Sequence, residues 1–212
     1  MKRRTLDLLT SIGGLGLALL LLVAGLVLTS NANFAKSYVH DQMAQQKITF
    51  KTVDKLTDEE KAMPGLIKYA GQDLLTGKQA EVYANEFIGL HLRTATKGLS
   101  YAELGVPAAD AKAKLTAAKD AGVTDLTALE KDVATTTATR ETAFKGETLR
   151  GLLLTSFGFS ELGRKADQFS KIAYLGSALF LLLALAGFAH ALRTSKDKVF
   201  GAPEPARTVV RV

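Results

Sequence analysis

The chain has 212 residues, no cysteine and a formal net charge of +6 at pH 7. The absence of cysteine excludes disulfides, thiol nucleophiles, cysteine-based zinc sites and iron–sulfur clusters. The positive charge does not indicate a nucleic-acid partner, because residues 32–171 contain 19 basic and 18 acidic residues and the excess lies towards the two ends.

Two apolar stretches dominate the chain. Leu8–Leu28 and Ile172–Leu192 each span 21 residues without Asp, Glu, Lys or Arg. As helices rising about 1.5 Å per residue, they would match the roughly 30 Å hydrocarbon core of a bilayer. The sequence therefore predicts transmembrane helices over residues 8–29 and 172–192. Ser30–Ala32 would suit signal-peptide cleavage, but the apolar run is longer than a usual signal core, so we expect an uncleaved anchor.

Basic residues indicate the orientation. Three precede the first stretch within residues 1–7, and five follow the second within residues 193–212. We expect the protein to lie in the cell membrane (inner or plasma membrane). Because cytoplasmic flanks carry the Lys/Arg excess, both termini should be cytoplasmic and residues 30–171 extracytoplasmic. The basic group at residues 164–171 runs against this orientation. The tail over residues 193–212 is short and polar, and we expect it to be disordered.

Small residues form one stripe along each apolar stretch. Such stripes let helix backbones approach closely, and this packing drives association in lipid. The sequence leaves open whether the stripes pack on each other, on a second copy or on another membrane protein. The predicted partners are therefore the lipid bilayer and either a homo-oligomer or another membrane protein. The stripes are Ser11, Gly14, Ala18 and Gly25, and Ala173, Ser177, Ala184, Gly187 and Ala191.

The segment between the stretches is predicted to be helical. Three capping boxes punctuate it, in which a hydroxyl and a Glu or Gln three residues later satisfy free backbone N–H groups. We expect an all-α fold, with two transmembrane helices flanking an extracytoplasmic helical bundle. The boxes are Thr57 with Glu60, Thr76 with Gln79, and Ser100 with Glu103. Helices are expected over residues 34–46, 66–75, 77–97, 108–121 and 125–155, with a short extended piece over 47–53. The apolar segment 151–160 is too short to cross a membrane and would be either core or a surface segment on the outer leaflet.

Residues 77–97 carry the weak candidates for a ligand site. Tyr83, Phe87 and His91 fall on one apolar stripe of helical period, with Ala80, Ala84, Ile88 and Ala95. His91 could be a ligand or an acid–base group, but a buried, hydrogen-bonded histidine is the commoner case. Glu147 and Arg150 are spaced to pair on one helix face, as a structural clamp or a partner contact.

Several segments carry a resemblance to a known family. They are Gln46–Phe50, Pro64–Gln72, Thr76–Ala80 with Tyr83–Ala84, Phe87–Ile88 before His91–Leu92, and Phe144–Leu154. These segments resemble a family of small actinobacterial membrane proteins that have two transmembrane helices and an outer helical domain. The resemblance covers roughly residues 8–192. That family has no established activity, so the resemblance implies a topology and no site residue.

No motif for a catalytic centre, a metal or a cofactor stands out, so the sequence predicts a protein that is not an enzyme and carries no cofactor. The first hypothesis is an accessory or scaffold subunit that associates through the small-residue stripes. The alternative is an extracytoplasmic module that binds or senses a ligand or lipid and signals through a partner. A metal-dependent hydrolase using His40 and His91 is disfavoured, because two distant histidines are a weak zinc signal.

Overall fold

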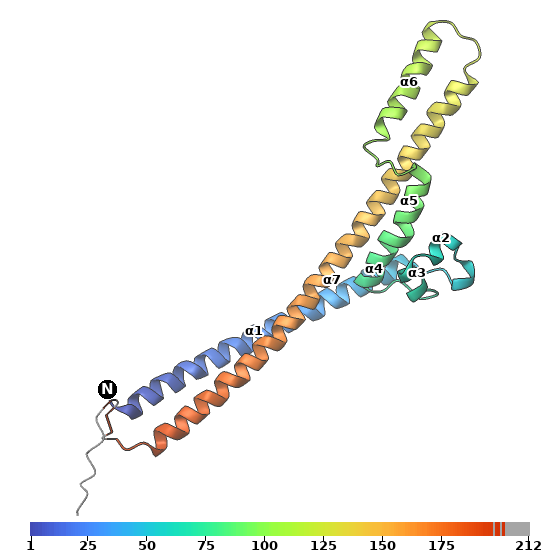
Figure 1. Cartoon of the computed structure of the whole chain (residues 1–212). Coiled ribbons are helices and arrows are strands. Elements are labelled where there is room, and N and C mark those ends of the chain that lie inside the picture. Colours follow the sequence, from blue (N-terminus) through green and yellow to red (C-terminus); the bar gives the residue numbers. More distant parts are fainter. Residues whose placement is uncertain (197, 200, 202–212) are drawn as a thin grey trace, which may run out of the picture. The chain divides into compact units, whose positions relative to one another are not determined.

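The computed structural model describes residues 1–196, 198, 199 and 201 (Figure 1). Within these residues all regular structure is helical, and the β-type pairing consists of two isolated bridges, Lys2 with Val199 and Thr49 with Asp73. The all-α prediction is confirmed. The tail over residues 193–212 is predicted to be disordered. Of this tail, residues 197, 200 and 202–212 lie outside the described residues. The chain divides into two compact units, Met1–Asn33 with Arg164–Val212 and Phe34–Gly163. Each unit is described by itself.

Unit 1 (Met1–Asn33 with Arg164–Val212) is built from parts of two long helices. The helix α1 covers Arg3–Gln46 and α7 covers Thr127–Arg193, and in unit 1 they lie side by side and antiparallel (Figure 1). Both helices are long and apolar enough to cross a membrane by length and composition. The sequence predicted a break after residue 155, whereas α7 is continuous. The physical reason is that no proline occurs within α7, and an isolated glycine costs a helix only about 1 kcal/mol.

Unit 2 (Phe34–Gly163) contains the main hydrophobic core. The end of α1 and the middle of α7 pack there with short helices from the intervening chain. Buried Phe50 packs edge-on to Tyr83 at 5.3 Å between ring centroids, and Leu66 and Leu74 are fully buried. The short helices are α2 (Asp58–Lys61), α3 (Pro64–Lys68), α4 (Gly77–Val82), α5 (Gly89–Thr96) and α6 (Gly105–Asp120), with the 3-10 turn η1 (Val53–Lys55) and the π-helical segment η2 (Tyr83–Ile88).

The predicted capping boxes all form. Thr57 and Glu60 cap α2, and Thr76 and Gln79 cap α4, each with both reciprocal hydrogen bonds. Ser100 and Glu103 form the same exchange, but they do so in a turn that precedes α6. The helix expected over 66–75 is shorter than predicted, because α3 ends at Lys68 and the chain then turns through Gly71 with a positive φ of 71°.

The helix α6 and the first part of α7 form an antiparallel hairpin (Figure 1). The more buried positions of both helices recur with alternating spacings of three and four residues, which is the spacing of a coiled-coil seam. Alanine and leucine are equally common in this seam, and its alanines let the two backbones approach closely. The seam positions are Leu104, Ala108, Ala111, Leu115 and Ala118 on one side, and Leu126, Leu129, Val133, Thr136, Arg140 and Ala143 on the other.

Candidate functional site

The helix predicted over residues 77–97 contains a wide turn that the sequence did not predict. Instead of one α-helix, the chain forms α4, the π-helical segment η2 and then α5. A π-helical turn holds an extra residue, and such turns occur frequently at functional sites. The consequence is a change of face, since the residues after η2 are rotated relative to those before it.

This rotation decides which side chains are buried in α5. Ala80, Ala84 and Ile88 of the predicted stripe are buried, but Ala95 is exposed. Gly89 and Thr96 take the inward positions of α5 instead. The expectation that His91 is buried in the core is therefore wrong, because its side chain is 51% exposed.

A buried carboxylate lies beside His91. Glu60, in α2, is completely buried. Its Oε1 accepts a hydrogen bond from Lys51 Nζ at 2.7 Å, and its Oε2 accepts one from the Thr57 backbone N–H at 2.8 Å. The Nε2 atom of His91 lies 3.4 Å from Oε1 of the same carboxylate. Two side chains with basic nitrogens therefore meet at one oxygen atom.

The environment of Glu60 favours its charged form. Burial raises the pKa of this carboxyl, but the hydrogen bonds from Lys51 and from the Thr57 backbone, with the charge of Lys51 and the contribution of His91, lower it overall below the ordinary 4.5. Burial also raises the pKa of the Tyr83 hydroxyl above 10.0. Glu60 is thus a buried anion that is held by its partners.

The aromatic candidates of the sequence lie together around this carboxylate. The rings of Tyr83 and Phe87 stack at 4.7 Å, and those of Phe87 and His91 lie 4.4 Å apart. The ammonium of Lys51 lies 5.2 Å from the Phe87 ring centroid, within cation–π range. The Nδ1 atom of His91 is 2.7 Å from the Phe87 carbonyl oxygen. The structure therefore brings Tyr83, Phe87 and His91 together and adds Lys51 and Glu60.

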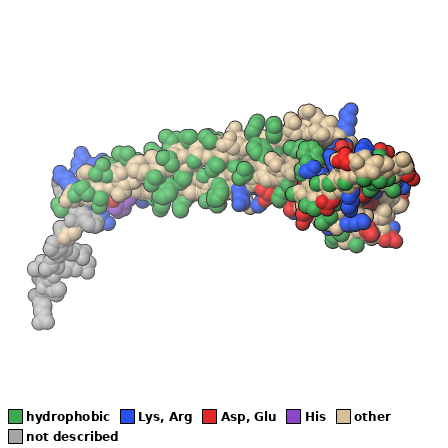
Figure 2. Space-filling view, turned by 90° about the horizontal axis from the view of Figure 1, so that it is seen from above, with side chains coloured by type: hydrophobic (Ala, Val, Ile, Leu, Met, Phe, Trp, Pro, Cys, Tyr) green, Lys and Arg blue, Asp and Glu red, His purple; other side chains and the backbone are tan. Residues whose placement is uncertain are grey.

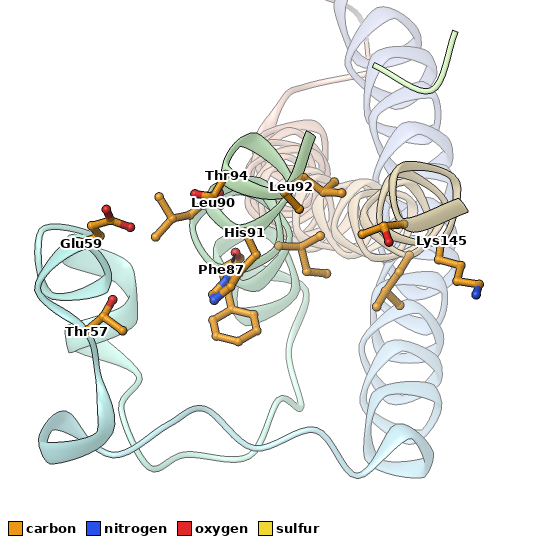
Figure 3. A pocket seen from close by; sticks show the side chains of 13 residues that line it. Thr57, Glu59, Phe87, Leu90, His91, Leu92, Thr94 and Lys145 are labelled. Carbon is orange, nitrogen blue, oxygen red and sulfur yellow. Dashed lines mark hydrogen bonds between the residues drawn. The ribbon is translucent and has the colours of Figure 1, made fainter. Parts of the chain in front are cut away.

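Phe87 and His91 line an open, mainly apolar groove of about 660 Å³ (Figure 3). Figure 3 shows Thr57 and Glu59 on one side of it, Phe87, Leu90 and His91 in the middle, and Lys145 of α7 on the other side. This volume falls in the range of about 300–1,000 Å³ that is typical of small-molecule pockets. The remaining lining residues are Ile88, Leu92, Thr94, Ala95, Thr142, Gly146 and Leu149.

Glu147 and Arg150 hold two different segments against α7. Glu147 Oε1 accepts a hydrogen bond from the Tyr101 backbone N–H at 2.8 Å, and Arg150 Nη2 donates to Asn85 Oδ1 at 3.0 Å. The predicted pairing of Glu147 with Arg150 is not among the ion pairs of the described residues. Each side chain instead has a contact outside its own helix, and these contacts tie the segments before and after α5 to α7.

The small-residue stripes of unit 1 face each other. A Cβ placed on Gly14 would lie 3.5 Å from Ala184 Cβ, and Ser177 donates a 2.7 Å hydrogen bond to the Ala18 carbonyl. A Cβ on Gly187 would meet the Ser11 side chain. Close to these contacts, Asp7 Oδ2 and His190 Nδ1 are 2.9 Å apart. Ala173 and Ala191 also lie on the less exposed side of α7.

Gly25 packs beside the ring of Tyr174. A Cβ on Gly25 would collide with the Tyr174 ring at 2.6 Å. The Tyr174 hydroxyl is 2.9 Å from Thr29 Oγ1, so the ring is fixed at both its face and its tip. Among the alternatives that the sequence left open, the structure thus contains the packing of one stripe on the other.

The sequence did not predict the contacts of two carboxylates in the site region. Glu60 was predicted only as a capping residue, and Glu86 was assigned to no contact. Glu86 Oε2 instead accepts hydrogen bonds from the backbone N–H groups of Gly65 at 2.7 Å and Leu66 at 3.1 Å, and so caps α3 from another element. No signal in a single sequence identifies such long-range contacts.

Metal-ligand geometry is not present among the described residues, which contain no group of three or more His, Asp or Glu side chains able to share an ion. His40 is beside Asp41 at 3.1 Å, whereas His91 is beside Glu60.

Comparisons with known proteins find no matching family model, no similar curated protein and no similar solved structure. The resemblance to the actinobacterial membrane family therefore stays a prediction.

Proposed function

We propose that the protein is a non-catalytic integral membrane protein with two spans, whose outer unit binds a small apolar molecule in the groove over α5. Both termini are cytoplasmic in this proposal, and residues 30–171 are extracytoplasmic. The single observation that carries the binding function is the groove itself, with its apolar lining and its few polar side chains.

The exposure of apolar side chains supports the membrane location. In the most apolar 18-residue windows of α1 and α7, only 11% and 17% of the residues are buried. Leu20 and Leu182 are 64% and 65% exposed. Figure 2 shows hydrophobic side chains along the elongated helix pair. A core helix of a water-soluble protein would be mostly buried, whereas lipid would cover these side chains.

The orientation can be tested in the cysteine-free chain without background. A cysteine replacing Val123, which is half exposed in the turn after α6, should react with a membrane-impermeant maleimide on intact cells. A cysteine replacing Ser195, beyond the end of α7, should react only after permeabilisation. The reverse labelling pattern would overturn the proposed topology, and labelling of both on intact cells would overturn the two-span arrangement.

The groove is favoured over the small-residue stripes as the binding surface. The stripes motivated the scaffold hypothesis, but they already contact each other within one chain. The groove floor, in contrast, remains open, with exposed Ala95 and half-exposed His91. A ligand there would bury apolar surface at roughly 25 cal/mol per Å².

The binding function is tested by isolating the full chain with its surrounding native lipid and analysing the retained small molecules by mass spectrometry. Ala95→Trp would fill the groove from an exposed floor position. Ala113→Trp, on an exposed part of α6, is the matched control. We expect one molecule retained near one-to-one by the wild type and by the control, and lost in Ala95→Trp. Identical small-molecule profiles in all three proteins would overturn the proposal.

A second candidate function is that of an accessory subunit for another membrane protein. The observation that favours it is a set of exposed apolar side chains on α7, including Phe144, Leu149 and Leu152. The same isolation would then retain a stoichiometric protein partner in the wild type, and this partner would be lost when Leu152 is changed to Glu. Retention of the partner by Leu152→Glu would count against this surface.

A further inference from the structure

We propose that His91 and Glu60 form a proton-dependent clasp. The clasp holds α2, which forms one side of the groove, against the groove floor, and it releases α2 when His91 loses its proton. The proposal rests on the proposed binding function, since it describes how the same groove opens. The clasp consists of the contact of 3.4 Å between His91 Nε2 and Glu60 Oε1.

Each ring nitrogen of His91 faces an oxygen atom. Nδ1 faces the Phe87 carbonyl oxygen at 2.7 Å, and Nε2 faces the Glu60 carboxylate. A neutral imidazole has one N–H group, so each neutral tautomer turns a lone pair towards one of these oxygens. The imidazolium has an N–H on each nitrogen, so one bonds to the carbonyl oxygen and the other faces the carboxylate as an ion pair. The contact with Glu60 is therefore attractive in the charged form and lost or repulsive when the Nδ1–H tautomer is present.

The position of the clasp connects it to the groove. Glu60 belongs to α2, and its neighbours Thr57 and Glu59 line one side of the groove. His91 lies on the floor and is half exposed, so solvent protons reach it. The contact thus joins a side of the groove to its floor, and its loss frees α2 to move relative to α5.

The other charges around His91 do not supply the switch. Glu60 of α2 lies beside His91 and binds Lys51 from the segment before η1, and Glu59 and Lys145 line the same groove from α2 and α7. Lys145 Nζ is 3.7 Å from Glu141, and Lys51 is bound to Glu60. Between pH 5.5 and pH 7.5 histidine is the side-chain type that changes its charge, whereas lysines and carboxylates generally keep theirs.

The base of the α2 segment has its own anchors, so only a local opening is expected. Phe50 N–H donates to the Gln72 carbonyl at 2.9 Å, and Leu74 N–H donates to the Ile48 carbonyl at 2.8 Å. The capping box of α2 and the Lys51–Glu60 pair also remain when the clasp is lost. Residues 56–62 should therefore respond to pH, whereas residues 48–50 and 72–74 should not.

The test is hydrogen exchange with mass spectrometry on the full chain in phosphatidylglycerol–phosphatidylethanolamine nanodiscs, at pH 5.5 and 7.5 and corrected for intrinsic exchange rates. We expect residues 56–62 of the wild type to exchange about three- to ten-fold faster at pH 7.5, a modest factor because His91 is half exposed. His91→Gln should remove this pH dependence. His40→Gln is the matched control, because His40 faces an exposed Asp41 and lies outside the groove.

Two results would overturn the clasp: pH-independent exchange of residues 56–62 in the wild type, or the same pH dependence in His91→Gln as in His40→Gln. The experiment needs no ligand, so its failure leaves the retained-molecule experiment unaffected. Conversely, a pH-dependent α2 in a protein that retains no small molecule would overturn the binding function and keep the clasp.

Discussion

Replacing Glu60 with Gln should destabilise the α2 segment strongly and selectively. The carboxylate is completely buried and binds Lys51 and the Thr57 backbone N–H at 2.7 and 2.8 Å. Gln keeps the size of the side chain but removes the charge, and it places an amide N–H₂ where at least one donor now points. Gln can keep the capping box of α2, as Gln79 does in α4, so the loss falls mainly on the pair with Lys51.

The size of this destabilisation depends on how exposed Lys51, the partner of Glu60, is. Breaking a fully buried ion pair costs roughly 3–5 kcal/mol, largely because the remaining charge is left unpaired. Lys51 is 37% exposed and can regain water, so we expect a smaller loss of about 2–3 kcal/mol in the free energy of opening of this segment. This corresponds to roughly a 30- to 150-fold increase in the open population.

The pH dependence has a defined sign. Because the pKa of Glu60 is lowered on folding, its ionised form stabilises the folded state above the ordinary value of 4.5. This stabilisation should be lost as the pH falls from 4.5 through the lower pKa of the folded state. Glu60→Gln has no carboxyl to titrate, so its opening should lack this acid-dependent component.

Trypsin digestion of the full chain in nanodiscs measures the opening, since cleavage at Lys55 and Lys61 tracks the open population when closing is fast. Glu59→Gln is the matched control, because the adjacent Glu59 is exposed. We expect cleavage of Glu60→Gln to be roughly 30- to 150-fold faster than that of the wild type. Cleavage of Glu59→Gln should change less than two-fold. Equal cleavage rates in the two variants at pH 7 would refute the assignment of Glu60 as a buried, charge-bound residue.

Two further predictions use glycines with matched controls. In Gly77→Ala the new Cβ would collide with the Ser160 side chain, so the α4 contact with α7 should weaken by about 1–3 kcal/mol in hydrogen exchange, whereas Gly158→Ala has open space and should leave it unchanged or slightly stabilised. In Gly14→Leu the larger side chain would separate α1 from α7 in unit 1, whereas Gly13→Leu points into open space. Disulfide cross-linking of cysteines placed at positions 18 and 177 should fail in the first and persist in the second; cross-linking in both would contradict the packing of the stripes.

The predictable part of the fold follows from local chemistry. Thr57 and Thr76 begin helices where their capping boxes indicate, because a cap depends on residues only three positions apart. The apolar stretches likewise give two long helices, since length and composition are local properties. The continuity of α7 was not predicted, because the polar stretch before residue 172 resembles a linker and nothing local shows that its helix continues.

The candidate site was predictable only in part, and the reason is the π-helical segment. A straight α-helix places Phe87 and His91 on one stripe, and the two rings are indeed neighbours at 4.4 Å. The extra residue within η2 rotates α5, however, so the period of 3.6 residues no longer identifies its buried face. Glu60 could not be assigned to the site at all, because 31 positions separate it from His91 in the sequence.

The same wide turn explains why the groove exists. If α4 continued into α5 without it, the stripe from Ala84 through Ile88 would continue into His91 and Ala95, and these would face the core. With η2 in place, Leu92 faces Gly146 of α7, so close that a Cβ on Gly146 would overlap it, and His91 is left on the open side beside Glu60. π-helical turns are rare and occur mostly as single turns inside α-helices. Here the turn leaves the imidazole of His91 at the groove and next to the buried Glu60 carboxylate, as the proposed binding function requires.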